Sequence, residues 1–333
     1  MATAIALLSG GLDSILAVRL VAAQGISVEI LHFTSIFDTA KKSGLARARE
    51  LSAELGLPIK EVDVTNEMMA LVRNPRFGHG ANLNPCIDCK ILMLSRAKKY
   101  MEASGARFVV TGEVLGQRPM SQHRQALELI EKESGLKGLI LRPLSARLLE
   151  PTIPEQNGLV DREKLLAHSG RSRKVQMDLA KEFEMKNYPG SAGGCLLTDP
   201  GFANRLEESI KHGEYSVEDI EFLKIGRHFR LLKKYKLIVG RDQEENEIIT
   251  DKAPEGGCLI EPLGSNGPTS FLRDKTDESL KLALDICAAY CDGEGSVKLR
   301  AGNKKDVVLQ WEKEYSVVID KAIINKDDNC RRL

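Results

Sequence analysis

A pair of glycines, flanked by serines and followed by an aspartate, lies near the start of the chain in Ser-Gly-Gly-Leu-Asp-Ser, residues 9–14. This Gly-Gly loop follows an apolar run (residues 4–8) that predicts a buried strand, and it precedes a run that predicts a helix (15–21). Glycines allow a tight turn and a close approach of ligand to backbone, and a helix start favours anions. The loop is therefore predicted to hold a pyrophosphate, and its members are Ser9, Gly10, Gly11, Asp13 and Ser14.

The presence of Asp13 in the loop predicts that a metal ion binds there together with the pyrophosphate. A carboxylate beside a phosphate would repel it unless the carboxylate binds Mg²⁺ or orients the loop. The loop is not of the Walker type, which is longer and carries a Lys-Ser/Thr pair. The structural alternative is an ordinary glycine-rich turn between a strand and a helix. The six-residue pattern at the first strand of an α/β sequence favours a site for ATP and Mg²⁺ instead.

Three cysteines form the second group with chemical potential. Cys86 and Cys89 are spaced so that both thiolates could reach one metal at a helix start, and Cys195 follows two glycines far downstream. Three thiolates are one short of the usual structural zinc site, whereas a [4Fe–4S] cluster on three cysteines leaves one iron open. The alternatives are a redox pair or half of a zinc site for Cys86 and Cys89, and an inert buried thiol for Cys195.

A third group, the Thr-Gly-Glu loop (residues 111–122, TGEVLGQRPMSQ), leaves another predicted strand. Gly112, Glu113 and Gln117 offer close approach and hydrogen bonds to a nucleotide or a substrate base. At the end of the strand predicted over 28–33, His32 and Phe33 are expected at the same edge of the sheet. A polar turn with a helix cap at Ser121 is the alternative.

The elements that must position these groups alternate between strand and helix. Strands are predicted over residues 4–8, 28–33, 59–64, 108–111 and 138–141, with helices between them. This alternation predicts an α/β fold with a doubly wound parallel sheet, whose ligands bind at the carboxyl ends of the strands. Helices over 161–168 and 174–183 begin a helical extension. Strands over 228–232, 237–240, 247–250, 297–300, 307–311 and 315–319, with a helix over 277–290, predict a small α+β domain.

We therefore expect three parts: residues 1–150, an α/β domain that carries the Gly-Gly loop and, by the resemblance described next, is a PP-loop ATP pyrophosphatase domain; 151–225, a helical extension with Cys195; and 226–333, a small α+β domain. The charge is balanced, with 48 Lys and Arg against 47 Asp and Glu, so an RNA-binding surface must be local. Without an apolar run long enough for a membrane span or a signal peptide, the expected location is the cytoplasm, where the seven cysteines stay reduced.

The Gly-Gly loop resembles the SGGxDS signature of the PP-loop ATP pyrophosphatases. Together with the Thr-Gly-Glu loop and the Leu-Arg-Pro-Leu run at 141–144, it resembles the tRNA 4-thiouridine synthetases over roughly residues 4–200. The Asn-Pro run ending at Cys89, with Cys195, resembles the tRNA 2-thiouridylases. Adding Cys86 makes the cysteines resemble those of the iron–sulfur-dependent tRNA thiolases.

This resemblance implies ATP-dependent thiolation of a tRNA uridine, with 4-thiouridine favoured over 2-thiouridine. Asp13 and the three cysteines would be the catalytic residues, and the cysteines would also be the ligands of a [4Fe–4S] cluster. A cluster-free persulfide route, another adenylating or amide-forming PP-loop enzyme and a non-catalytic RNA-binding protein are the alternatives. The partners implied are tRNA and a sulfur donor, either sulfide or the persulfide of a cysteine desulfurase; a homodimer is one assembly left open.

Compared with the 4-thiouridine enzymes, we expect a departure, since no THUMP-type or ferredoxin-like domain is recognisable before the first predicted strand of this sequence and no rhodanese domain after the PP-loop region. Residues 226–246 instead resemble the NFACT RNA-binding domain. A solvated basic face on a structural β domain is the alternative. A second basic group is expected near Cys195. The predicted RNA contacts from both regions are Arg171, Arg173, Lys174, Arg227, Arg230 and Arg241.

Overall fold

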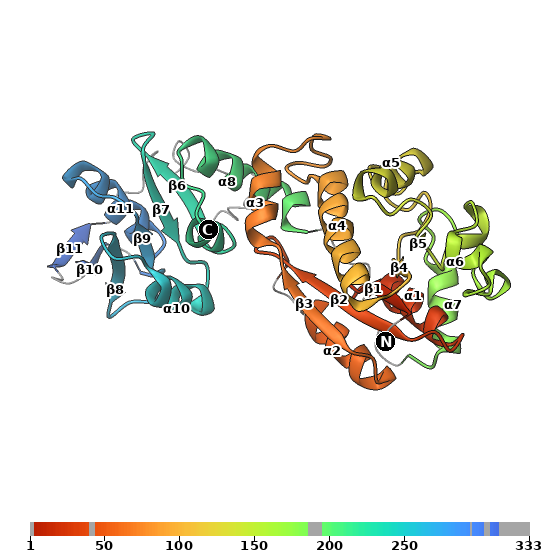
Figure 1. Cartoon of the computed structure of the whole chain (residues 1–333). Helices are drawn as coiled ribbons and strands as arrows, with labels where there is room; N and C mark the ends of the chain where they lie inside the picture. The colour runs from red at the N-terminus through yellow and green to blue at the C-terminus, as the bar shows by residue number, and fades with distance from the viewer. Residues whose placement is uncertain (1–2, 40–43, 186–194, 294, 303–306, 313–333) are drawn as a thin grey trace. The chain divides into compact units, whose positions relative to one another are not determined.

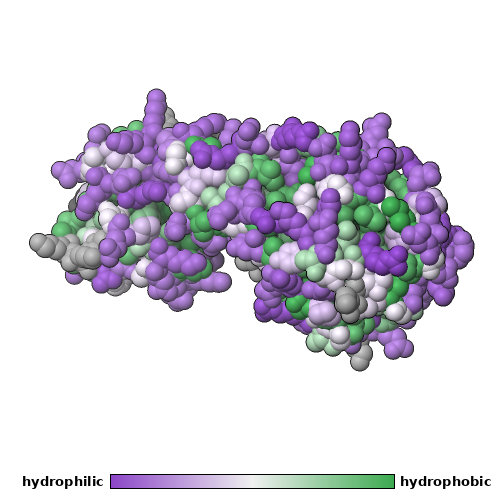
Figure 2. Space-filling view, in the orientation of Figure 1, coloured by the Kyte–Doolittle hydropathy of each residue, from purple (hydrophilic) through white to green (hydrophobic). Residues whose placement is uncertain are grey.

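The computed structural model describes residues 3–39, 44–185, 195–293, 295–302 and 307–312. The chain divides into two compact units, Met1–Thr198 and Asp199–Leu333. The predicted helical extension over 151–225 is thus divided between them. Most of the visible surface of both units is hydrophilic (Figure 2). None of the described helices is long and apolar enough to cross a membrane.

The first unit is built on five parallel strands in the order β3-β2-β1-β4-β5 (Figure 1). The chain runs outward from β1 to β3 and then returns to the other side of β1 with β4. The carboxyl ends of β1 and β4 therefore flank the switch point, where ligands bind in sheets of this kind. The predicted doubly wound α/β fold is confirmed. The strands are β1 Ala4–Leu7, β2 Val28–Thr34, β3 Ile59–Asp63, β4 Phe108–Val110 and β5 Ile140–Leu141.

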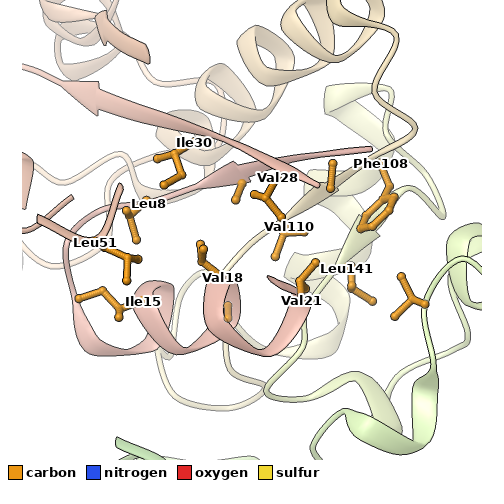
Figure 3. Close-up of a cluster of buried hydrophobic side chains, with 14 of the residues drawn as sticks. Leu8, Ile15, Val18, Val21, Val28, Ile30, Leu51, Phe108, Val110 and Leu141 are labelled. Atoms are coloured by element: carbon orange, nitrogen blue, oxygen red, sulfur yellow. The ribbon is translucent and has the colours of Figure 1, made fainter. Parts of the chain in front are cut away.

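Apolar side chains fill both faces of this sheet. On one face Ile15, Val18 and Val21 of α1 pack against Val28, Ile30 and their neighbours (Figure 3). On the other face Ile5, Leu31 and Val109 pack against Leu94 of α4 and Ile130 of α5. Successive residues of a strand point to opposite faces, so a strand buried on both faces is a continuous apolar run.

The helices of the first unit are α1 Leu12–Ala22, α2 Gly44–Leu55, α3 Thr65–Arg73, α4 Cys86–Ser104, α5 Arg124–Ser134, α6 Ile153–Gln156 and α7 Lys174–Glu182, with 3-10 turns η1 Ala146–Leu148, η2 Arg162–Lys164 and η3 Leu196–Thr198. The predicted helix over 161–168 is wrong, because only η2 forms there. The backbone N–H groups of Leu166 and His168 donate to the carbonyls of Pro143 and Leu144, each at 2.9 Å, instead of continuing a helix.

The second unit is built on an antiparallel sheet in the order β11-β10-β8-β9-β7-β6. Its core is formed by the inner face of the sheet and by α11, including Leu284, Ile286 and Cys287. The elements are α8 Pro200–Lys211, α9 Val217–Phe222, β6 Arg227–Leu231, β7 Tyr235–Val239, α10 Gln243–Lys252, β8 Cys258–Leu263, β9 Ser270–Leu272, α11 Asp277–Ala289, β10 Ser296–Gly302 and β11 Val307–Glu312.

The strand predicted over 247–250 is wrong, because these residues belong to α10. Asp242 caps that helix by accepting a hydrogen bond from the Glu245 N–H at 3.0 Å, and Ile249 is buried on its inner side. Strands β8 and β9 were not predicted. The strand predicted over 315–319 lies outside the described residues.

Leu284→Ala should destabilise the second unit by about 2–5 kcal/mol, the usual cost of deleting a buried leucine side chain. Trp311, the sole tryptophan of the chain, lies in β11 and donates to Asp285 on α11 at 2.8 Å, so its fluorescence reports this unit directly. Urea unfolding followed at Trp311 should show a lower midpoint. Val217→Ala, at an exposed position of α9, is the control and should leave the midpoint nearly unchanged. An unchanged midpoint in Leu284→Ala would contradict its place in the core.

Candidate active site

The Gly-Gly loop joins β1 to α1 in a shape that only glycine permits. Gly10 has a φ of +73°, and a Cβ there would overlap the carbonyl oxygen of Gly44. The Ser14 hydroxyl donates to the Gly11 carbonyl at 2.8 Å and lies 3.1 Å from the Ser9 hydroxyl. Gly11 is the N-cap residue and supplies no side-chain cap. The first N–H groups of α1 therefore have no capping side chain and suit an anion.

Arg47 of α2 adds a cation to this loop that the sequence did not predict. Its Nε donates to the carbonyl of Gly10 at 2.7 Å, and the side chain is half-buried. Arg47 stands in an amphipathic helix that carries no recognisable motif. Only the fold brings it to the loop, so no local pattern could have identified it.

The Thr-Gly-Glu loop lies directly on the start of α1. A Cβ at Gly112 would lie 2.5 Å from the Ser14 nitrogen, so the two backbones touch at this point. Gln117 then reaches across and donates its amide to Asp13 Oδ2 at 2.9 Å. Both groups predicted to bind the nucleotide are thus brought together at the switch point.

This contact leaves two buried oxygen atoms without hydrogen-bond partners, Asp13 Oδ1 and Gln117 Oε1. A carboxylate oxygen and an amide oxygen are both ligands that Mg²⁺ accepts, and a buried acceptor without a partner is costly. The residues present therefore fit the Mg²⁺ that the sequence predicts.

Glu113 is buried, with 2% of its side chain exposed, and its contacts are to neighbouring protein groups. Arg142 Nε donates to Oε2 at 3.1 Å, the Thr111 hydroxyl donates at 3.2 Å, and Lys90 Nζ lies 3.6 Å from Oε1. Burial alone would raise the pKa of Glu113, but Lys90 and Arg142 outweigh it and the pKa is lowered. Glu113 is therefore ionised and links the Thr-Gly-Glu loop to Lys90, the residue after Cys89.

His32 and Phe33 both lie near the end of β2. His32 is buried, and its Nδ1 is 2.6 Å from the carbonyl oxygen of Leu8, the residue before the Gly-Gly loop. Phe33 is half-buried and packs against the core face that contains Ile5 and Leu31. His32 thus contacts the backbone of Leu8, which leads directly into the Gly-Gly loop.

The segments that carry the three cysteines are joined by hydrogen bonds. Cys86 and Cys89 occupy the first turn of α4, and Cys195 precedes η3. The Asn82 amide donates to the Thr198 carbonyl at 2.8 Å, and the Leu196 N–H donates to the Phe37 carbonyl at 3.0 Å. The Cys195 segment is therefore anchored both to the loop before α4 and to the loop after β2, although Gly193 and Gly194 lie outside the described residues.

Two of these thiols are unusually difficult to ionise. Burial raises the pKa of Cys89 to about 12, with nearby Lys90 opposing and Cys195 and Cys86 adding to the rise. Burial likewise raises the pKa of Cys195 to about 11, and Cys86 adds to it. The three sulfurs are thus close enough to influence one another electrostatically. The Asn84 amide lies 3.0 Å from the Cys86 sulfur.

Cysteine thiolates are suitable ligands for a metal or an iron–sulfur cluster, but the arrangement of the three cysteines in the described structure does not form a ligand set. Across the ranges that the structure describes, no three His, Cys, Asp or Glu side chains are placed to hold a metal ion. The predicted [4Fe–4S] ligation by Cys86, Cys89 and Cys195 is therefore not supported by the present geometry.

The basic group of residues 171–174 lies beside the Thr-Gly-Glu loop. The Gly170 N–H donates to the Leu115 carbonyl at 2.7 Å, just before Arg171. Arg171 and Lys174 are exposed, and Arg173 is half-buried. The N-terminal end of α7 thus carries these cations close to the predicted nucleotide site.

Arg230 in the second unit is not available for RNA, which corrects the prediction. Its guanidinium contacts Glu208 at 2.5 Å and Glu214 at 2.7 Å, and only 8% of the side chain is exposed. Glu208 also pairs with the buried Lys236 at 2.7 Å. Although burial would raise the pKa of Glu208, Arg230 and Lys236 lower it.

The other two RNA contacts predicted in this unit are Arg227 and Arg241, and both contact neighbouring groups of the protein. Arg241 Nε contacts Glu245 at 3.0 Å, in an i,i+4 pair at the start of α10. The Arg227 guanidinium lies over the ring of Tyr290, 4.8 Å from its centroid, and donates to the Gly240 carbonyl at 3.3 Å.

Comparison with known proteins finds similarity to one family model in each part of the chain. Residues 1–147 match the family described as "Thiamine biosynthesis protein (ThiI)", and residues 226–315 match "NFACT protein RNA binding domain". A probable tRNA sulfurtransferase of Staphylococcus aureus (strain Mu3) is 25% identical over 256 residues, covering 74% of this chain and 55% of the relative. The tRNA-specific 2-thiouridylase MnmA of Syntrophotalea carbinolica is 28% identical over 114 residues, 32% of each chain. This chain thus spans about half of the first relative and a third of the second.

Two solved structures resemble the chain more distantly. The U34-tRNA thiolase NcsA from Methanococcus maripaludis, with its [4Fe-4S] cluster, is 16% identical at a TM-score of 0.34, covering 67% of this chain and 74% of that one. A predicted subunit of tRNA methyltransferase from Methanocaldococcus jannaschii is 14% identical at a TM-score of 0.37, with coverage of 66% and 91%. The Gly-Gly loop and the Thr-Gly-Glu loop fall within the first of the two family matches, and strands β6 to β11 fall within the second.

Proposed function

We propose that this chain is an ATP-dependent tRNA sulfurtransferase that thiolates a uridine, with 4-thiouridine favoured over 2-thiouridine. The observation that carries the proposal is the contact of the Gly-Gly loop with the Thr-Gly-Glu loop, which leaves Asp13 Oδ1 and Gln117 Oε1 without partners at the switch point. The ThiI-family match and the curated sulfurtransferase relative support the same activity.

The first half-reaction is adenylation of the uridine. The N–H groups at the start of α1 and the hydroxyls of Ser9 and Ser14 would hold the phosphates, and the two unpartnered oxygens would hold Mg²⁺. A carbonyl oxygen of the uridine attacks the α-phosphate of ATP, and pyrophosphate leaves. The carbonyl oxygen is now bonded to AMP, a far better leaving group than oxide.

The second half-reaction is sulfur transfer, for which we propose the cysteines Cys86, Cys89 and Cys195. When sulfide is the donor, it attacks the activated carbon and AMP leaves. When a persulfide is the donor, its terminal sulfur, carried on one cysteine, attacks the carbon and AMP leaves; a second cysteine thiolate then attacks the sulfur of the first cysteine, which releases the thiocarbonyl and forms a disulfide that an external thiol must reduce. Burial keeps Cys89 and Cys195 protonated near neutral pH, so these thiols need added positive charge to become reactive. No step here depends on the [4Fe–4S] cluster, which remains a prediction.

Gln117→Ala should slow pyrophosphate release by about 10- to 100-fold, because losing the partner of a metal ligand typically costs that much. Asp13→Asn should slow it further, since one of its two carboxylate oxygens is replaced by an amide group. The products should be AMP and pyrophosphate, measured by chromatography with radiolabelled ATP. Asp63→Asn, at the carboxyl end of β3, is the matched control and should behave as the wild type. Formation of ADP and phosphate would reject the PP-loop mechanism.

Protein prepared anaerobically should contain about four irons per chain if the [4Fe–4S] prediction is correct. Cys86→Ala, Cys89→Ala and Cys195→Ala should each lower the iron content and abolish thiolation but spare pyrophosphate release. Cys291→Ala, a buried thiol of the second unit, is the control. Iron-free protein that is fully active with a persulfide donor would contradict the cluster, and tightly bound zinc would make the site structural.

In metal-free protein, Cys89 and Cys195 should react slowly with iodoacetamide at pH 7–8, because their raised pKa values keep the thiolate fraction small. The rate should rise about tenfold per pH unit until the pKa is approached, as titration of one thiol requires. Mass spectrometry of the alkylated peptides measures it. The same protein in denaturant is the control and should react as ordinary thiols. Rapid alkylation of the folded protein at pH 7 would show that the thiols are already activated.

A further inference from the structure

A pocket of about 1110 Å³ lies within the second unit and is separate from the candidate active site. It is lined by the loop after β7, by α10, by the β8–β9 loop and by the end of α11, and all its lining residues fall within the 226–315 match to the RNA-binding domain. Its volume slightly exceeds the range of about 300–1,000 Å³ that is typical of small-molecule sites, so there is room for a nucleotide.

One wall of the pocket carries a flat cationic and aromatic surface. The Arg227 guanidinium lies over the Tyr290 ring, 4.8 Å from the centroid, and its Nη1 donates to the Gly240 carbonyl at the pocket edge. Both side chains are half-buried. Planar guanidinium groups and aromatic rings are the surfaces on which unpaired RNA bases stack.

The β8–β9 loop forms another part of the pocket wall, and this wall supplies groups that could recognise the edge of a base. Ser265 Oγ is buried and makes no hydrogen bond. Asn246 braces this wall, because its Oδ1 accepts from the Thr269 N–H at 2.9 Å and its Nδ2 donates to the Gly267 carbonyl at 3.4 Å. The wall is therefore held in place while one hydroxyl remains unpartnered.

The charge of the lining favours a base over a run of phosphates. Arg300 is paired with Glu261 at 2.5 Å. The charged lining residues nearly balance, with three cations against four carboxylates: Arg227, Arg241 and Arg300 against Asp242, Glu247, Asp251 and Glu261. A phosphate-tracking groove would instead be strongly cationic.

We propose that this pocket holds one unpaired nucleotide of an RNA, with its base on the Arg227–Tyr290 pair and its edge at Ser265. The inference rests on the proposed function in taking tRNA as the natural ligand. It replaces the predicted RNA contact at Arg230 by a site in the same unit for a single base.

The test uses the full chain, a short single-stranded oligoribonucleotide and an unmodified tRNA transcript, with affinities from fluorescence anisotropy at several salt concentrations. Tyr290→Leu should weaken binding of the oligonucleotide about tenfold, as loss of a stacked base does. Its salt dependence should be unchanged, because no phosphate contact is lost. Tyr290→Phe keeps the ring and should bind as the wild type.

Tyr235→Leu is the matched control. Tyr235, in β7, forms another cation–aromatic pair of this unit, with Lys234 Nζ 5.2 Å from its ring centroid, and Tyr235 does not line the pocket. It should bind RNA as the wild type does. If Tyr290→Leu does not fold by circular dichroism, Ser265→Ala replaces it and should weaken binding roughly fivefold through one lost hydrogen bond.

The outcomes separate this inference from the proposed function. Wild-type affinity in folded Tyr290→Leu, or in Ser265→Ala if that variant is used instead, would overturn the pocket assignment and leave thiolation untouched. Wild-type protein that binds the oligonucleotide but neither binds nor thiolates tRNA would overturn the proposed function and keep the pocket. Binding of neither RNA would overturn the pocket, while nucleoside mass spectrometry would still test thiolation independently.

Discussion

The backbone contact between Gly112 and Ser14 is the constraint on which the candidate active site depends. A Cβ at position 112 would lie 2.5 Å from the Ser14 nitrogen, so any other residue would push the Thr-Gly-Glu loop away from α1. The contact sets Gln117 against Asp13 and leaves one oxygen of each side chain buried without a hydrogen-bond partner. The contact occurs where the neighbouring strands β1 and β4 end. The strand order of the sheet therefore determines the position of the site, and the side chains determine its chemistry.

Glu113 connects the Thr-Gly-Glu loop to the helix that contains Cys86 and Cys89. Buried carboxylates persist only when paired, and Glu113 is paired with Arg142 and Lys90. Lys90 follows Cys89 on α4, and its positive charge opposes the effect of burial on that thiol. The carboxylate that holds the Thr-Gly-Glu loop is thus linked to Lys90, the cation that favours a thiolate at Cys89, and this link joins the proposed adenylation site to the proposed sulfur site.

The N-terminal fold was predictable because strands β1 and β4 in the middle of the sheet are short continuous apolar runs, whereas the edge strand β3 mixes apolar and polar residues. Its two loops were predictable because glycine and polar residues gather there. Arg47 and the pairing of Arg230 were not, since their partners lie 37 residues and at least 16 residues away along the chain. The strand predicted over 247–250 failed because two adjacent isoleucines resemble a strand locally, whereas the cap at Asp242 and the buried Ile249 stabilise a helix.

The ion pairs of Arg230 and Lys236 tie the antiparallel sheet of the second unit to residues that precede the match to the RNA-binding family. The family match starts at residue 226, yet both buried cations find their carboxylates on α8 and just after it, at Glu208 and Glu214. A fragment cut at residue 226 would leave two buried positive charges uncompensated, a penalty of several kcal/mol for each. A fragment that keeps this sheet stable must therefore include α8. The structural unit is thus longer than the match to the RNA-binding family, which begins at residue 226.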